Sequence, residues 1–384
     1  MLNRLGGLLG FRCNGHPALS EPKATARLSH AYVNKIRSAV PANEVNSYFL
    51  RFAASQLAED PRRQAVFKRM AEKSGIEHRY SCLVPSGDPE GECLDAGNLY
   101  RRDAFPGTAQ RMDIYEDQAH RLATRAVDAL ELGADRSRIT HLIVATCTGF
   151  SAPGIDLEIV ARCGLDPSVE RTLIGFMGCY AAINALKLAR HIVRSEPDAQ
   201  VLVVNIELCT LHLRETKDLE KLLSFCLWGD GCTAALVTAD PVGLRLDSFK
   251  ALLAADTADL MSWSVRNDGF DMVLSGRVPH AIEDTLGAHR DVFLRGAAVA
   301  DIDLWAVHPG GRSVLDAVER VLDLPAEALG RSRKVLRDKG NMSSATVMFV
   351  LEDMLATADP GMRGCGMAFG PGLTAETLLF EAVG

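Results

Sequence analysis

The stretch from residue 141 to residue 238 alternates between short apolar runs and longer segments with helical periodicity. The strand-like runs cover 141–147, 171–176, 200–206 and 232–238, and the helix-like segments cover 156–163 and 180–195. Short, continuous apolar runs are typical of strands that are buried on both faces. Strands that alternate with helices predict an α/β architecture with largely buried sheets.

A similar order of segments recurs, more weakly, after residue 240. The strand-like run at 303–308 resembles that at 141–147, and it is followed by helix-like segments at 313–322 and 343–355 and by strand-like runs at 366–370 and 376–381. Before residue 141, a strand is expected at 31–36 and helices at 62–73 and 113–130. The repeated order predicts two related halves, 1–240 and 241–384, with the boundary near Asp240 and Pro241.

Composition excludes several classes of protein. The 384 residues are 47% hydrophobic and 24% charged, as in ordinary globular proteins, and the formal net charge is -7. Binding to nucleic acid normally leaves a basic footprint, and the chain has no block of lysine and arginine. No run of 18 apolar residues occurs, so we expect no membrane span.

The cysteines and the first residues bear on the cellular compartment. Ten cysteines are scattered without a CxxC pair, which favours reduced thiols in the cytoplasm over disulfides or a zinc site. Residues 1–14 have a short apolar stretch that Arg4 and Arg12 interrupt, and no cleavage site for a signal peptidase follows. We interpret this segment as a flexible leader.

Cys179 lies where the apolar run 171–178 gives way to the helix-like run 180–190. The first amide N–H groups of a helix lack intrahelical acceptors, and they would stabilise a thiolate and lower the pKa of the thiol. Gly178 would allow the sharp turn that exposes the side chain. A cysteine at such a position is also a common core residue, so the position alone leaves both interpretations open.

Two residues of the second half are candidate partners for a nucleophilic thiol. His308 ends an apolar strand and is followed by Pro309-Gly-Gly311, and Asn341 precedes the helix-like run 342–351. A histidine can serve as base, and an amide can donate to a developing oxyanion. Each also has an ordinary interpretation, since His308 could be a hydrogen-bonded turn residue and Asn341 a helix cap.

Four segments resemble the motifs of type III polyketide synthases, the chalcone synthase-like enzymes. They are Gly175-Phe-Met-Gly-Cys-Tyr-Ala-Ala182, Trp305-Ala-Val-His-Pro-Gly-Gly311, Gly340-Asn-Met-Ser-Ser-Ala345 and Phe369-Gly-Pro-Gly-Leu-Thr-Ala-Glu-Thr377. The resemblance runs from about residue 30 onward. It implies a thiolase-like fold of five layers, αβαβα, made of two pseudo-symmetric halves, and a homodimer. It also implies a catalytic triad of Cys179, His308 and Asn341.

The same resemblance implies the reaction and its substrates. Cys179 would accept an acyl group from acyl-CoA, and His308 and Asn341 would hold the thioester oxygen of malonyl-CoA during decarboxylation. No metal or redox cofactor is required. Further substrate contacts would come from four residues within the motifs, Ser343, Phe369, Gly370 and Pro371. A basic helix face with Arg69 and Lys73 would lie at the CoA entrance.

Residues that line the cavity of related enzymes point to the starter unit. Trp228 and Met272 align with the pair of phenylalanine gatekeepers of chalcone synthases. Small residues stand where bacterial alkylpyrone-forming members open a side tunnel for a long acyl chain, and Trp263 would narrow the cyclisation cavity; the small residues are Thr148, Ala152 and Cys209. We therefore expect a medium or long fatty acyl-CoA starter and an alkylpyrone or alkylresorcinol product.

Three alternatives remain at this stage. A malonyl-CoA-primed synthase of the tetrahydroxynaphthalene or phloroglucinol type would use the same triad. An initiating β-ketoacyl-acyl carrier protein synthase has a Cys-His-Asn set on the same fold. An inactive partner subunit would lack part of the reactive set, whereas this chain has all three residues.

Overall fold

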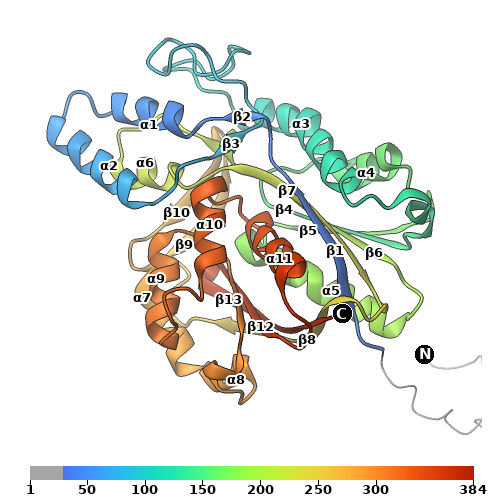
Figure 1. The fold of residues 1–384 in the computed structure, drawn as a ribbon. Helices are drawn as coiled ribbons and strands as arrows, with labels where there is room; N and C mark the ends of the chain where they lie inside the picture. Colours follow the sequence, from blue (N-terminus) through green and yellow to red (C-terminus); the bar gives the residue numbers. More distant parts are fainter. Residues whose placement is uncertain (1–28) are drawn as a thin grey trace, which may run out of the picture.

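One mixed sheet of nine strands runs through the computed structural model of the protein, which describes residues 29–384 (Figure 1). In spatial order the strands are β11 (Leu304–Val307), β12 (Arg363–Gly370), β13 (Thr374–Val383), β8 (Gly243–Leu253), β1 (Tyr32–Ala39), β7 (Asp230–Thr238), β6 (Val201–Leu208), β4 (His141–Thr146) and β5 (Glu170–Gly175). Pairing is parallel at both ends, in β11–β12 and β6–β4–β5, and antiparallel between them. The predicted leader, 1–14, lies outside the described residues.

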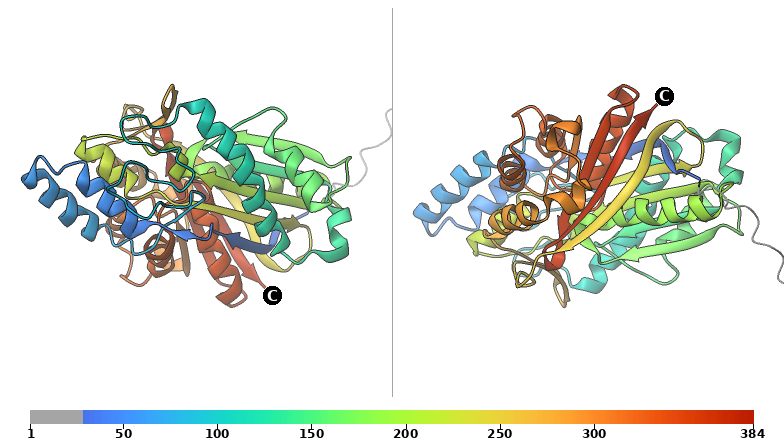
Figure 2. Two further views of the ribbon diagram at one scale, coloured as in Figure 1. Left: turned by 90° about the horizontal axis from the view of Figure 1, so that it is seen from above. Right: turned by 90° about the horizontal axis from the view of Figure 1, so that it is seen from below.

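Two helices form the central layer of the molecule. They are α5 (Ala181–Ser195) and α11 (Ala345–Thr357), and both contribute to one apolar core with strands from the two ends of the sheet. Every residue from Ala345 to Leu351 is buried, as expected for a helix that is covered on all sides. Seen from below in Figure 2, yellow β8 runs beside the red strands of the second half, and the green strands of the first half lie beyond it.

Outer helices cover the remaining faces of the sheet. On one side α3 (Thr108–Asp128) and α4 (Ile155–Cys163) pack on β4, β6 and β7, and on the other α7 (Val278–Ala288) and α9 (Arg312–Leu322) pack on β11 and β12. The layers therefore alternate as αβαβα, which confirms the predicted fold class. The predicted boundary near Asp240 falls in the turn between β7 and β8.

Smaller elements complete the chain. Three outer helices share an apolar cluster: α1 (Asn46–Ser55), α2 (Pro61–Lys73) and α6 (Leu219–Phe225). The remaining helices are α8 (Arg290–Leu294) and α10 (Gly330–Lys339). The remaining strands form the short pair β2 (Asn43–Glu44) and β3 (Tyr80–Ser81) and the hairpin β9 (Met261–Arg266) and β10 (Gly269–Leu274).

The strand and helix segments expected from the sequence are all present, with small shifts at their ends. Strand β5 differs from expectation in its surroundings: a buried strand was predicted, and most of its side chains are exposed. It forms the edge of the sheet, so only one neighbour covers it. The sequence analysis did not identify the eleven-residue strand β8 or the hairpin β9–β10.

His212 attaches the β9–β10 hairpin to the first half. Its Nδ1 accepts a hydrogen bond from the Phe270 N–H at 3.1 Å, and its Nε2 donates to the Thr148 carbonyl at 2.7 Å. The imidazole stacks on the Phe270 ring with centroids 4.1 Å apart. Burial lowers the pKa of His212 to about 3, and protonation of Nδ1 would break the bond from Phe270.

We predict that acid weakens the fold through this ring. Because the folded-state pKa lies below the ordinary value near 6.5, the unfolded chain binds the proton first, and the free energy of unfolding falls as the pH drops from about 6.5 toward 3. The contribution is about 1.4 kcal/mol per pH unit for one histidine. Urea unfolding between pH 7 and pH 5 should show a shallower decline for His212→Gln than for the parent protein. Equal slopes would contradict the assignment.

Candidate active site

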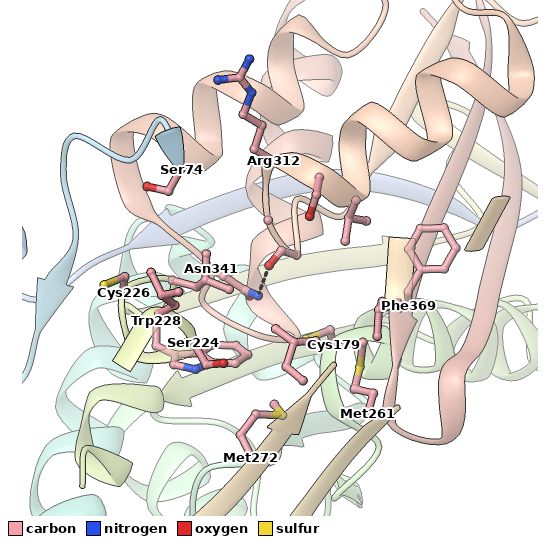
Figure 3. Close-up of a pocket in the computed structure, with 18 of the residues that line it drawn as sticks. Ser74, Cys179, Ser224, Cys226, Trp228, Met261, Met272, Arg312, Asn341 and Phe369 are labelled. Carbon is pink, nitrogen blue, oxygen red and sulfur yellow. Dashed lines mark hydrogen bonds between the residues drawn. The ribbon is translucent and has the colours of Figure 1, made fainter. Parts of the chain in front are cut away.

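A pocket of about 660 Å³ lies between the two halves, and all three members of the predicted triad line it. Figure 3 shows Cys179 and Asn341 on its wall, with Arg312 and Ser74 toward one end and Met272 toward the other. The three junctions that the sequence analysis identified separately therefore converge on a single cavity. Almost the whole of each of these three residues is buried, so their side chains are shielded from bulk water.

A tight elbow presents Cys179. Strand β5 ends at Gly175, and Gly178 adopts a φ of 72° at the start of the short 3₁₀ turn Gly178–Tyr180 that leads into α5. A Cβ at position 178 would lie 2.3 Å from Cδ of Pro371, in the second half of the chain. Glycine is thus required by both backbone conformation and close approach. The sharp turn predicted at Gly178 is confirmed, but it places the Cys179 side chain in a buried position and does not expose it to solvent.

His308 follows strand β11. Its backbone N–H donates to the Met367 carbonyl at 2.8 Å, which extends the pairing with β12 by one residue. Among residues 29–384, neither Nδ1 nor Nε2 of its ring has a hydrogen-bond partner. Burial lowers the pKa of His308 to about 3, so the ring is neutral near pH 7. An uncharged imidazole with both nitrogen atoms unoccupied is available to exchange a proton or to donate to a bound ligand.

Both backbone polar groups of Asn341, the N–H and the carbonyl, form hydrogen bonds. Its N–H donates to the Leu227 carbonyl at 2.7 Å, and its carbonyl accepts from the Gly229 N–H at 2.9 Å. The side-chain Oδ1 accepts from the Ser343 N–H at 2.9 Å, and Nδ2 donates to the Gly310 carbonyl at 3.2 Å (Figure 3). Since α11 begins only at Ala345, Asn341 is not its cap, and one N–H of the amide is left over for a ligand.

The electrostatics of the thiol differ from the sequence-based prediction. A lowered pKa was expected for Cys179, but burial raises it to about 12, and a hydrogen bond with the Ser343 hydroxyl at 3.8 Å offsets only part of that effect. Loss of water around the sulfur therefore outweighs the N-terminal end of α5. The predicted direction of the pKa shift was therefore wrong.

Glu207 is a buried residue at the site that the sequence analysis missed. Its carboxylate accepts hydrogen bonds from the Cys147 N–H and the Thr148 hydroxyl, both at 2.9 Å, and from the Ser344 hydroxyl at 2.5 Å. Ser344 belongs to the second half, so this carboxylate joins the two halves beside the pocket. Burial raises the pKa of Glu207. An acidic residue within the apolar run of β6 was the signal that could have identified it.

The other predicted site residues divide into two groups. Nine of them line the pocket: Lys73, Thr148, Cys209, Trp228, Trp263, Met272, Ser343, Phe369 and Pro371. Three do not: Arg69, Ala152 and Gly370. Arg69 is exposed on α2, whereas Lys73 and Ser74 face the cavity. Gly370 lies just behind the wall, since a Cβ there would be 3.4 Å from the Cys179 backbone nitrogen. The sequence analysis did not anticipate Arg312 at the rim.

A second, smaller cavity adjoins the pocket, and we call it the side chamber. It has a volume of about 70 Å³, and most of its lining is apolar and comes from α1 and the loop after β3, including Phe49, Phe52 and Leu94. Cys209 and Trp228 line both cavities. A group that passes between them must therefore pass these two side chains.

Comparison with known proteins agrees with this geometry. Residues 23–241 match the family described as chalcone and stilbene synthases, N-terminal domain, and residues 247–384 match the corresponding C-terminal domain. The fold and the site are those of an acyl-condensing enzyme. The chain belongs to the chalcone and stilbene synthase family and is a type III polyketide synthase.

Individual relatives are similar over nearly the whole chain. The alpha-pyrone synthesis polyketide synthase-like Pks18 of Mycobacterium tuberculosis is 34% identical over 371 residues, which is 92% of this chain and 91% of that protein. The crystal structure of PKS-I from the brown alga Ectocarpus siliculosus is 28% identical, has a TM-score of 0.83, and covers 94% of this chain and all of its own. The C-terminal type III polyketide synthase domain of Steely1 from Dictyostelium shares the fold, with a TM-score of 0.84 and 23% sequence identity. That match covers 92% of this chain and all of the Steely1 domain.

We predict that Gly178→Ala disrupts the elbow. The substitution places a Cβ in a left-handed conformation and against Pro371, so the free energy of unfolding should fall by at least about 2 kcal/mol. Gly175→Ala is the matched control, because its Cβ would meet nothing within 4 Å. It should change stability by less than about 0.5 kcal/mol. Similar losses for the two variants in urea unfolding would refute the elbow argument.

Proposed function

We propose that this enzyme loads a medium or long fatty acyl-CoA on Cys179, extends it with malonyl-CoA and cyclises the product to an alkylpyrone or alkylresorcinol. The observation that carries the catalytic part is the convergence of Cys179, His308 and Asn341 on one buried pocket. The starter preference is supported by the apolar side chamber and by the 34% identity to an alpha-pyrone synthesis protein.

Loading begins with proton transfer from the Cys179 thiol to the His308 imidazole. Burial keeps each group alone neutral, but thiolate and imidazolium attract each other strongly where water is excluded. The thiolate attacks the acyl-CoA carbonyl carbon, the sulfur–carbon bond to CoA breaks, and the CoA sulfur leaves with the proton from His308. The imidazole is neutral again, with one N–H available.

Extension requires a place for negative charge on the malonyl thioester. As the bond to the carboxylate breaks and carbon dioxide leaves, the electron pair moves to the thioester oxygen as an enolate. The neutral His308 N–H and the remaining Asn341 N–H donate to that oxygen. The enolate carbon then attacks the acyl-Cys179 carbonyl, the carbon–sulfur bond to Cys179 breaks and the cysteine leaves as the thiolate, and the chain, longer by two carbon atoms, is held as a CoA thioester. Because burial disfavours a charged imidazole, it keeps His308 in the neutral form that this step uses.

The acyl tail would enter the side chamber past Cys209. A cysteine is small, and the chamber beyond it is lined mainly by apolar side chains. Each methylene that leaves water for such surroundings contributes about 0.8 kcal/mol to binding. Thr148 also lines the main pocket, but Ala152 lines neither cavity, so the tail path is argued from Cys209 alone.

The malonyl-CoA-primed synthase remains the alternative, and one assay separates the two. The enzyme is incubated with malonyl-CoA alone and with malonyl-CoA plus lauroyl-CoA, and products are identified by mass spectrometry. We expect lauroyl-derived pyrones or resorcinols only in the second reaction, and no product from Cys179→Ala. Equal turnover without the acyl primer would overturn the starter preference. Activity of Cys179→Ala would overturn the catalytic assignment.

We predict that Cys209→Phe restricts the enzyme to starters with short acyl chains. The larger ring would close the passage to the side chamber, so turnover with lauroyl-CoA should fall at least about tenfold through lost burial of the tail. Turnover with butyryl-CoA is the internal control and should change by less than about threefold, because a four-carbon chain buries little beyond Cys209. Parallel losses for both starters would contradict the proposed tail path.

We further propose that the enzyme is a homodimer through the edge strand β5. As an edge strand, β5 has no strand partner on one side. Four apolar side chains on or near it are exposed: Phe150, Leu173, Phe176 and Met177. An uncovered, apolar edge strand invites pairing with another chain, and an apolar patch of this kind marks an interface. A second copy would cover it by presenting the same edge.

We predict that Leu173→Lys shifts the protein toward the monomer. The charge would have to be buried in the proposed interface without a partner, so light scattering after size-exclusion chromatography should give about half of the parent mass. Leu253→Lys is the control, because Leu253 is more exposed but lies on β8, away from β5 in the sheet. A parent protein of monomeric mass would sink the proposal.

A further inference from the structure

Trp228 stands between the main pocket and the side chamber. It lines both cavities, as Cys209 does, and it is the larger of the two shared side chains. Figure 3 shows Trp228 beside Asn341, with Met272 below it in the view. Any chain that extends from Cys179 toward the side chamber therefore passes Trp228 and Cys209.

The backbone of Trp228 is fixed to the catalytic region. Its carbonyl accepts a hydrogen bond from buried Arg79 Nη1 at 2.8 Å, and the residues on either side of it bond the peptide of Asn341. The resulting bridge between Trp228 and Asn341 is parallel. The backbone position is thus set with respect to the proposed oxyanion site, so any adjustment of the indole has to come from its side-chain torsions.

The indole N–H of Trp228 lacks an acceptor among residues 29–384, although the side chain is only 7% exposed. Trp263 lines the same pocket, and its indole N–H donates to the Cys147 carbonyl at 2.7 Å. A buried N–H without a partner costs about 1 to 3 kcal/mol. A phenylalanine would form an apolar wall without that cost, so the N–H is the feature that tryptophan adds here.

The expected ligands of the pocket differ in what they could offer this donor. A poly-β-keto chain carries a carbonyl oxygen on alternate carbon atoms, whereas a fatty acyl tail carries none. A small rotation of the indole as the chain enters would pair the N–H with such an oxygen and remove the penalty of the unpaired donor.

We propose that the Trp228 indole N–H donates a hydrogen bond to a keto oxygen of the growing chain and thereby distinguishes extended intermediates from unextended acyl groups. This inference rests on the proposed function. It makes Trp228 a specificity-determining residue, because the loss of one donor removes the preference for the keto group and leaves an aromatic ring at the junction.

The test compares two ligands that differ by one oxygen. Dissociation constants for acetoacetyl-CoA and butyryl-CoA are measured by calorimetry on Cys179→Ala, which cannot be acylated at that position, and on the Cys179→Ala, Trp228→Phe double variant. We expect acetoacetyl-CoA to bind about fivefold to tenfold more tightly than butyryl-CoA when Trp228 is present. The preference should fall below about twofold with phenylalanine.

An unchanged ratio of the two constants in the double variant, with both thioesters still bound, overturns this inference and leaves the proposed function intact. Failure of Cys179→Ala to bind either thioester overturns both. A second measurement needs no substitution at position 228. In ¹⁵N-indole spectra, acetoacetyl-CoA should move the Trp228 N–H resonance downfield while butyryl-CoA does not, and buried Trp305, which does not line the pocket, serves as the reference. Identical shifts with the two ligands would also overturn the inference.

Discussion

The packing of α5 and α11 between the two ends of the sheet is the constraint on which the rest of the molecule depends. Both helices are largely buried and belong to the same apolar core. The segments that lead into them carry Cys179 and Asn341, and β11 delivers His308 to the same place. The position of the reactive groups is therefore a consequence of how the central layer is filled, and it needs no separate structural device.

Burial at this centre determines the charge state of the site. Cys179 and His308 are both held neutral because water is excluded from them, and in the proposed reaction charge must be created as the reaction proceeds. The nearby carboxylate of Glu207 is satisfied by three donors from both halves. Beside the pocket, the hydrogen bonds of Glu207 form a polar network that joins the two halves. Cys179 and His308 have few hydrogen bonds of their own, as expected for side chains that bond to a ligand.

Local patterns in the sequence were sufficient for the elbow and for many of the strands and helices, but not for β8 or the hairpin β9–β10. Apolar runs mark β4, β6 and β7, and the junctions at Cys179, His308 and Asn341 lie within recognisable motifs. The direction of the Cys179 pKa shift was not predictable in this way, because it depends on how completely distant segments remove water. The side chamber was also hidden, since α1, the loop after β3 and the segment near 209–228 meet only in the folded chain.

The elbow has a consequence for the time at which the enzyme becomes competent. Gly178 turns against Pro371, and Tyr180 donates a hydrogen bond to the Pro371 carbonyl from 191 residues earlier in the sequence. Domains generally begin to fold from the N-terminal side during synthesis. A nascent first half can form its own strands, but it has nothing to brace the turn that carries the thiol. The turn that carries Cys179, the proposed nucleophile, is therefore completed late, after the ribosome has made the segment around residue 371.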